Sequence, residues 1–189
     1  MRYSPEHKQA TRKKILEAAH RGFRREGFQG LGVDGLAKDA GVTSGAFYKH
    51  FKSKDDAFKE SVERGVGEFQ AAVEMFRKQY GEAWLDEFAK FYLGEKRCAE
   101  MGDSCAMQSL TPDVTRAEEP IRSAYQAALL KAAQAFTCES SDFSKKKVPD
   151  SVWANIALLI GGATLARAVK DPMLADEIAD AVQAAIKTG

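Results

Sequence analysis

The stretch "AGVTSGAFYKHFKSK", residues 40–54, combines aromatic, basic and small side chains in an order that predicts two different faces. Gly41 supplies a tight turn between a short helix predicted over 31–41 and a second short helix that reaches Phe51. A helix, a tight turn and a second helix have the proportions of a helix-turn-helix unit. The residues predicted to point into its core are Ile15, Phe23, Leu36, Val42, Phe47 and Phe51.

The opposite face of the second helix is polar, and its first residues are small. A recognition helix enters the major groove of DNA with its N-terminal residues, so small side chains there allow close approach. Tyrosine can stack on sugar or donate to phosphate, and histidine and lysine can pair with phosphates. The predicted contacts to double-stranded DNA are Thr43, Ser44, Gly45, Tyr48, Lys49, His50 and Lys54. The alternative is a small helical core whose charged face is only solvated.

The net charge of +1 hides an uneven distribution along the chain. Residues 1–54 contain 12 Lys and Arg against 5 Asp and Glu, a balance of +7, whereas residues 55–189 contain 16 against 22, a balance of −6. A basic N-terminal part followed by an acidic remainder indicates that only the former meets a polyanion. A charged face is also commonly just solvated. Charge alone therefore does not decide between a nucleic-acid-binding face and a solvated one.

Helical periodicity dominates the rest of the chain, which predicts an all-α fold. Residues 1–53 are expected to form a three-helix DNA-binding domain, and residues 54–189 a second helical domain. Ser4-Pro5 should begin the first helix and Gly27 should close it, Thr43 or Ser44 should cap the third helix, and Ser53 the fourth, which should bend near Gly65 and Gly67. Further helices are predicted over 82–94, 105–110, 118–136, 148–170 and 171–187, with a loop over 95–104 and a polar, mobile connection over 137–147.

Composition favours a cytoplasmic protein with no membrane segment. The three cysteines (Cys98, Cys105 and Cys138) are an odd number, which argues against a disulfide scaffold and suits a reducing compartment. No continuous apolar run approaches the roughly 18 residues that span a bilayer. The first residues, "MRYSPEHKQATRKK", lack the apolar region of a signal peptide.

The segment "ILEAAHRGFRREGFQGLGVDGLAKDAGVTSGAFYKHFKSKDDAF", residues 15–58, resembles the DNA-binding domain of TetR/AcrR-family transcriptional repressors. The resemblance extends over about residues 8–58 and is most specific in "GVTSGAFYKHFKSK". It implies a homodimer whose last two helices form a four-helix interface. It also implies that residues 54–189, the body of the protein, form a helical domain for effector binding and dimerisation, which binds a small molecule and thereby releases DNA. It also implies that Ser44, Gly45, Tyr48, Lys49, His50 and Lys54 are the DNA contacts.

Asp34 departs from the pattern of the resemblance, because many members of that family carry a neutral or basic residue near the phosphates at this position. Its carboxylate could cap the second helix while turned away from the DNA backbone, or it could help to read a cytosine amino group. Lys8 and Arg12 on the first helix could reach phosphate or could simply be solvated.

The two closing helices carry apolar stripes too broad for surface helices, and Gly161 and Gly162 would let another helix approach closely. The predicted dimer interface is Trp153, Ile156, Leu159, Ile160, Ala163, Ile178, Val182 and Ile186. A two-fold dimer would place two recognition helices about one turn of DNA apart and predicts a palindromic operator. The alternative is that these residues form an internal core.

Aromatic and sulfur-containing side chains in the body could line a pocket for a small-molecule effector. The candidates are Trp84, Phe88, Phe91, Tyr92, Cys105, Met107, Tyr125 and Trp153. Such residues at helical spacing also form plain core. Cys98 and Cys105 could instead sense electrophiles or oxidants, because "GDSCAMQSLTPDV" loosely resembles the electrophile-sensing branch of the family; otherwise they are small buried apolar residues.

No enzyme, metal or cofactor is expected. The three histidines (His7, His20 and His50) have no cysteine or carboxylate at ligand spacing, and phosphate-binding glycine loops and nucleophile motifs are absent from the sequence. A helical adaptor protein is the remaining rival, and it would leave the basic N-terminal segment unexplained.

Overall fold

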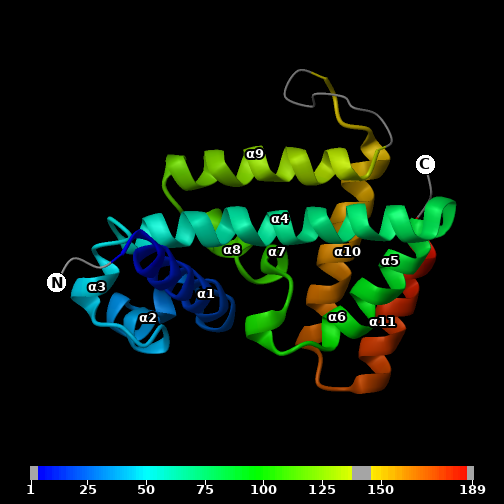
Figure 1. Cartoon of the computed structure of the whole chain (residues 1–189). Helices are drawn as coiled ribbons and strands as arrows, with labels where there is room; N and C mark the ends of the chain where they lie inside the picture. The colour runs from blue at the N-terminus through cyan, green and yellow to red at the C-terminus, as the bar shows by residue number, and fades with distance from the viewer. Residues whose placement is uncertain (1–3, 138–145, 187–189) are drawn as a thin grey trace. The chain divides into compact units, whose positions relative to one another are not determined.

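The structure, a computed structural model, describes residues 4–137 and 146–186, and every regular element in these ranges is helical (Figure 1). The all-α prediction is therefore confirmed. The α-helices are α1 (Pro5–Gly30), α2 (Val33–Asp39), α3 (Ser44–Phe47), α4 (Lys54–Tyr80), α5 (Trp84–Leu93), α6 (Glu95–Cys98), α7 (Ala106–Ser109), α8 (Thr111–Val114), α9 (Glu119–Ala135), α10 (Asp150–Ala168) and α11 (Pro172–Ala185). Short 3₁₀ turns cover Gly81–Ala83 and Met101–Asp103.

The chain forms two compact units, each discontinuous in sequence. Unit 1 contains the residues up to Gly65 together with Met101–Tyr125, and unit 2 contains Val66–Glu100 together with the residues from Gln126 onward. The helices α4 and α9 thus contribute residues to both. The division between 53 and 54 that the sequence suggests remains a prediction about domains.

The first helix begins as its sequence predicts. The Ser4 side chain accepts a hydrogen bond from the His7 amide at 3.3 Å, and Pro5 occupies the first turn, where its missing amide hydrogen costs nothing. Gly27 has a φ of 72° and a ψ of 171°, so its backbone is not helical, and the helical structure resumes after it up to Gly30. The regular helix is therefore interrupted by a kink at Gly27, where the sequence predicts its end.

The helix-turn-helix is formed by α2, the turn at Gly41 and α3. Gly41 has a φ of 67°, which residues with a side chain rarely adopt, so glycine is needed at this turn. The Thr43 hydroxyl accepts from the Ala46 amide at 3.2 Å, which identifies Thr43 as the cap. Regular helix ends at Phe47, earlier than predicted, although a backbone hydrogen bond of 3.0 Å from Phe51 to Phe47 keeps the chain turned.

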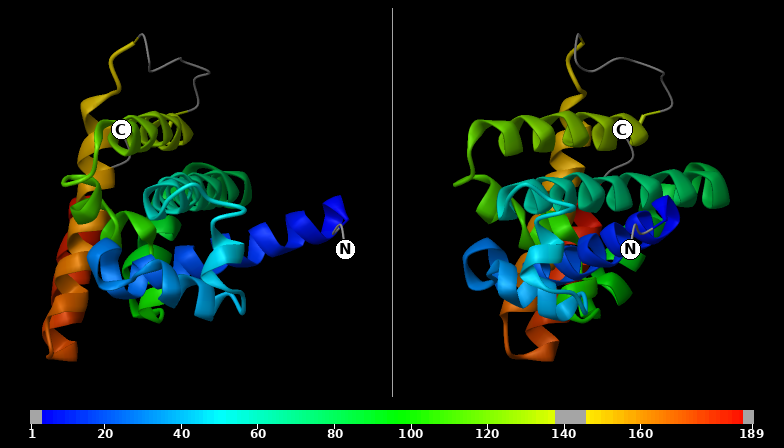
Figure 2. Two further views of the ribbon diagram at one scale, coloured as in Figure 1. Left: turned by 90° about the vertical axis from the view of Figure 1, so that its left-hand side faces the viewer. Right: turned by 60° about the vertical axis from the view of Figure 1, so that its left-hand side comes forward.

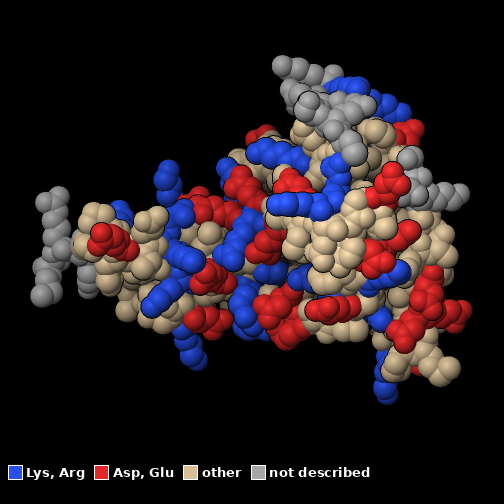
Figure 3. All heavy atoms as spheres, turned by 45° about the vertical axis from the view of Figure 1, so that its right-hand side comes forward, with Lys and Arg blue, Asp and Glu red and all other residues tan. Residues whose placement is uncertain are grey.

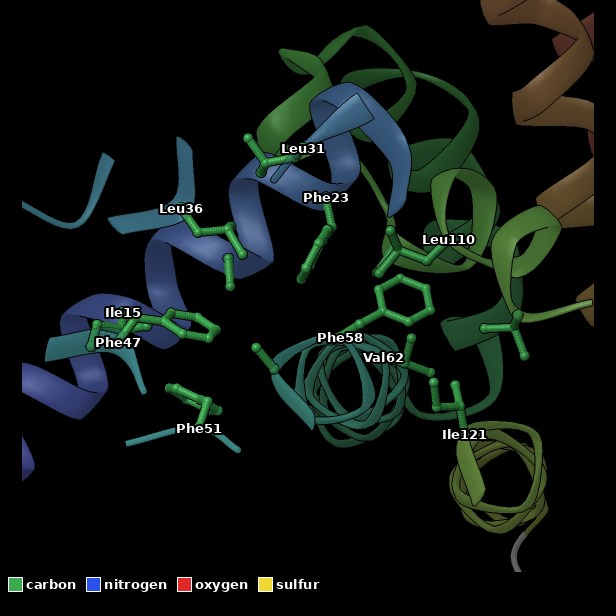
Figure 4. Close-up of a cluster of buried hydrophobic side chains, with 14 of the residues drawn as sticks. Ile15, Phe23, Leu31, Leu36, Phe47, Phe51, Phe58, Val62, Leu110 and Ile121 are labelled. Atoms are coloured by element: carbon green, nitrogen blue, oxygen red, sulfur yellow. The ribbon is translucent and has the colours of Figure 1, made fainter. Parts of the chain in front are cut away.

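One hydrophobic core holds unit 1 together (Figure 4). Ile15, Phe23, Leu36 and Phe47 are completely buried, and Phe51 is 1% exposed. The sequence predicted all five, and Val42 packs against the same core. Residues from the 101–125 segment complete it: Ala106, Leu110, Val114 and Ile121.

The fourth helix starts at the predicted cap, where the Ser53 hydroxyl accepts from the Asp56 amide at 3.1 Å. The Asp56 carboxylate in turn accepts from the amide of Lys52, the residue before the cap, at 3.1 Å. Helix α4 is continuous through Gly65 and Gly67. The bend predicted at these glycines stays a prediction.

Unit 2 contains an aromatic cluster and a close crossing of the last two helices. The rings of the cluster are Phe69, Phe76, Trp84, Phe88, Phe91, Tyr92 and Phe136. Figure 2 shows α10 and α11 lying against one another. A Cβ atom at Gly162 would lie 2.7 Å from Val182 Cγ2, so glycine permits this approach, as predicted.

The prediction of a loop over 95–104 is wrong, because α6 and the 3₁₀ turn Met101–Asp103 occupy most of this segment. Arg167 holds this segment by donating to the carbonyls of Arg97 and of Ala99, the latter at 3.0 Å.

Helix α10 also has the length and composition of a membrane span. Among the described residues it is the single helix with this property: an 18-residue window has a mean hydropathy of 1.2, and 39% of that window is buried. A core helix passes the same test, so α10 is weak evidence for a membrane protein. The polar connection predicted over 137–147 falls mostly outside the described residues, and so does Cys138.

Candidate nucleic-acid interface

The outer side of the helix-turn-helix presents four of the seven predicted contacts to solvent. Thr43, Gly45, Tyr48 and Lys49 are exposed, and Tyr48 retains 58% of its surface. The Tyr48 ring stands edge-on to Phe47, with centroids 5.4 Å apart, so the buried phenylalanine fixes the exposed tyrosine. A large aromatic side chain held in this way suits stacking on sugar or a hydrogen bond to phosphate.

His50 lies half-buried at the edge of this surface. Burial, and then the positive charges of Lys8, Arg12 and Lys49, lower the pKa of His50 below its ordinary value. The imidazole is therefore neutral near pH 7. Its Nδ1 atom is buried with no hydrogen-bond partner among the described residues. The same three cations form a basic patch around His50, which is the electrostatic feature that a phosphate backbone requires.

Lys54 and Arg12 are partly engaged by the protein itself. The Lys54 ammonium group donates to the Phe28 carbonyl at 2.9 Å and lies 4.0 Å from the centroid of the Phe28 ring. Arg12 forms an ion pair with Glu60 and lies 4.7 Å from the Phe51 ring centroid. Both cations thus anchor neighbouring elements, whereas Lys8 is exposed. The phosphate contact assigned to Lys54 stays a prediction.

Asp34 does not cap α2, contrary to one of the two expectations for it. The cap position is Gly32, which has no side chain, and the Asp34 carboxylate instead accepts a hydrogen bond of 2.5 Å from the Ser44 hydroxyl. The pair joins the start of α2 to the start of α3 on the predicted DNA-facing side. The sequence analysis discussed both residues but did not predict the hydrogen bond between them. Helical periodicity does not show which side chains ten positions apart will pair.

The described surface does not divide simply by charge. On the face drawn in Figure 3, Lys and Arg side chains are interspersed with Asp and Glu. Local arrangement therefore matters more than the balance of +7 in residues 1–54. In unit 1 the local arrangement that matters is the basic patch of Lys8, Arg12 and Lys49 around His50.

The predicted effector residues are distributed over both units. Trp84, Phe88, Phe91 and Tyr92 belong to the aromatic cluster of unit 2, in which Phe88 and Tyr92 have centroids 5.7 Å apart. Trp153 is half-buried in the same unit. Cys105 and Met107 are buried in unit 1, where Tyr125 lies 3.1 Å from the Thr111 hydroxyl. The aromatic packing in unit 2 agrees with the alternative expectation of plain core.

The predicted dimer residues separate into two groups. Trp153, Ile160, Ile178 and Val182 are half-buried. The others are buried within the chain: Ile156, Leu159, Ala163 and Ile186. The assignment of all eight residues to a dimer interface stays a prediction. The exposed large apolar residues of the same two helices are Leu165, Met173 and Leu174, at 61%, 82% and 41% exposure. The sequence analysis did not single out Leu165 or Met173 as interface residues.

A set of buried polar contacts fastens the 101–125 segment to α1. The sequence analysis did not predict these contacts. Arg24 is 7% exposed, and its guanidinium donates to the Ser104 carbonyl at 2.6 Å and to the His20 carbonyl at 3.2 Å. The Phe28 amide donates to the Asp113 carboxylate at 2.7 Å. A basic residue on the buried side of α1 was the available signal, but its partner lies 80 positions away.

The part of the chain that contains this surface matches a known family. Residues 15–60 match the sequence model of the bacterial regulatory proteins of the tetR family. Residues 15–60 therefore form a domain of the TetR family. An HTH-type transcriptional regulator of Staphylococcus aureus is 28% identical over 103 residues, which are 50% of this chain and 56% of that protein. The HTH-type transcriptional regulator AcrR of Shigella flexneri is 43% identical over 65 residues, 33% of this chain and 30% of AcrR.

The likeness in fold covers more of the chain than the likeness in sequence. The chain spans about half the length of the staphylococcal relative, and less than a third of AcrR. A TetR-family transcriptional regulator of Agrobacterium tumefaciens superposes with a TM-score of 0.76 at 17% identity, over 96% of this chain and all of that one. At that identity the match establishes the fold alone.

Proposed function

We propose that this TetR-family chain is a DNA-binding transcriptional regulator that reads duplex DNA with α3. One observation carries the proposal: Tyr48 and Lys49 stand exposed on a short helix that the left-handed turn at Gly41 and the buried Phe47 hold in place. This is the two-faced arrangement that a recognition helix needs. It also lies inside the range that matches the family, residues 15–60.

Lys49→Ala should weaken duplex binding and reduce its dependence on salt. Each phosphate contact releases about 0.9 counterion, so the slope of log K against log salt should fall by about 0.9 per bound subunit. The measurement is a salt titration of binding to a duplex selected from a random-sequence library. Lys131→Ala removes the same charge from an exposed site on α9 and should leave the slope unchanged. Wild-type binding that does not respond to salt would contradict the proposal and favour the adaptor.

The proposed regulator acts as a homodimer on a palindromic operator. The apolar residues exposed on α10 and α11, above all Leu165 and Met173, favour a helical interface on this face of unit 2. A two-fold axis would then present two α3 helices to adjacent major grooves.

Leu165→Glu should convert the protein to a monomer, because a carboxylate at the centre of an apolar interface loses its hydration without a partner. Sedimentation equilibrium measures the mass. Met75→Glu places the same charge at another exposed apolar residue, on α4 at 53% exposure, and should leave the mass at twice that of one chain. If the wild-type protein sediments with the mass of one chain, the proposed homodimer is wrong.

We extend the proposal to repression that a small molecule relieves from the body of the protein, in the cytoplasm and without catalysis. An apolar or aromatic compound suits the composition of unit 2, and screening such compounds for release of the bound duplex tests this step. The alternative release mechanism is modification of Cys105 or Cys98. Cys98 is exposed and accessible, whereas Cys105 is 5% exposed. Under the alternative, the Cys→Ser variant at the sensing position keeps DNA binding and loses release by N-ethylmaleimide.

A further inference from the structure

We infer that Asp34 and Ser44 together read a cytosine in each half-site of the operator. This inference rests on the proposed function and specifies the base chemistry of its recognition surface. The starting observation is the hydrogen bond of 2.5 Å that the Ser44 hydroxyl donates to the exposed Asp34 carboxylate. Ser44 is the first residue of α3, next to Gly45, where the helix backbone can come closest to base edges.

The bond between these residues fixes which hydrogen-bonding groups they can offer to DNA. The Ser44 hydroxyl has one proton, and that proton is directed at Asp34. Its remaining lone pairs are acceptors, and an ionised carboxylate is an acceptor only. The pair therefore presents acceptors and no donor at this point of the surface. A lone serine could have served as either donor or acceptor.

The major groove offers few donors to such an acceptor pair. Guanine shows N7 and O6, both acceptors, and thymine shows O4 and a methyl group. Adenine offers its N6 amino group beside the N7 acceptor, which would face the same carboxylate and be repelled. Cytosine offers its N4 amino group with only a C–H beside it, and aspartate accepting from cytosine N4 is a known pairing. Cytosine is thus the base that the pair fits.

The charge of Asp34 supports a reading role over a role in fastening α2 to α3. Among residues 4–137 and 146–186, no lysine or arginine forms an ion pair with Asp34, whereas Asp39 at the other end of α2 pairs with Arg25 at 3.3 Å. An uncompensated carboxylate on a DNA-facing surface repels phosphate and weakens binding to every sequence. A hydroxyl or an amide would fasten the helices without that cost, so the carboxylate calls for a specific donor in the complex.

The test compares the sequences that wild type, Asp34→Asn and Asp39→Asn select from a random duplex library at one salt concentration. The asparagine introduced by Asp34→Asn keeps an oxygen that can accept from Ser44 but adds a donor amide. We expect one position per half-site at which wild type prefers cytosine by about tenfold or more over guanine, in line with the usual cost of a mismatched pair. Asp34→Asn should lose this preference and tolerate purines there, with the other positions unchanged.

Asp39→Asn is the matched control, because it removes the same charge from another exposed position of α2, and Asp39 pairs with Arg25 rather than with Ser44. It should select the same sequence as wild type. Equal base preferences for wild type and Asp34→Asn would overturn the inference, and so would a loss of preference at a position where wild type does not choose cytosine. A wild type that selects no duplex at all contradicts the proposed function instead. Thermal unfolding of each variant establishes that a changed preference is not a folding defect.

Discussion

Phe23→Ala should lower the free energy of unfolding by about 3–5 kcal/mol, the usual cost of removing a fully buried aromatic ring. Phe23 is completely buried at the centre of the unit 1 core. Its ring stands edge-on to Phe58, with centroids 5.2 Å apart, and lies 6.0 Å from the Phe28 centroid. Truncation therefore removes two aromatic contacts and leaves a cavity between α1 and α4 that the surrounding helices can fill only in part.

Urea unfolding followed by circular dichroism measures this effect. Tyr48→Ala is the control, because it is also an aromatic truncation but at a side chain with 58% exposure. Its cost should not exceed about 1 kcal/mol, the value of its edge-on contact with Phe47. If Phe23→Ala and Tyr48→Ala destabilise the protein equally, Phe23 is not packed at the centre of the unit 1 core. The opposite pattern is expected for DNA, since Tyr48 belongs to the recognition surface.

Much of unit 1 follows from its sequence because local rules determine it. A left-handed turn needs glycine at position 41, a hydroxyl at position 43 can cap a helix, and apolar residues at helical spacing point to one side. These features identify the helix-turn-helix and its core residues Leu36, Phe47 and Phe51, all of which are buried. They also separate the exposed Tyr48 from the buried Phe47 beside it.

The packing of the 101–125 segment could not be predicted in this way. Arg24 meets the carbonyl of Ser104, and Phe28 meets Asp113, across 80 and 85 positions of sequence. Helical periodicity shows which side of a helix is buried but not which distant segment covers it. The same reason hid the bond between Asp34 and Ser44, since each residue looked like an independent polar group.

The two final helices show a different limit of periodicity. The apolar residues of α10 are spread over most sides of the helix. Their spacing therefore does not show which side packs on its own chain and which side faces outward. The prediction chose Ile156 and Leu159, which are buried, whereas Leu165 is 61% exposed. A helix that is apolar all round needs the positions of its neighbours, here α11 and α5, before its exposed face is defined.

The contact of α4 with the 101–110 segment leads to a second large expected effect, at Gly65. A Cβ atom at this position would lie 2.2 Å from the Ala106 Cβ and 3.3 Å from His20 Cε1. Gly65→Ala should therefore destabilise the protein by about 1–3 kcal/mol through overpacking, despite the better helix propensity of alanine. Gly67, two residues further along the same helix, has no atom within 4 Å of the point that a Cβ would occupy. Gly67→Ala should stabilise the protein by about 0.5–1 kcal/mol.

The Gly65→Ala effect has a specific rescue, because the clash is with one methyl group. Ala106→Gly removes that methyl and should by itself cost about 1 kcal/mol in helix propensity and lost packing. Combined with Gly65→Ala it should recover part of the lost stability, so that the double variant is more stable than the sum of the two single effects predicts. Urea unfolding of the four proteins measures the coupling. Strict additivity would mean that α4 and α7 do not touch at this point, and that the 101–110 segment is not seated against α4 beside His20 as the structure places it.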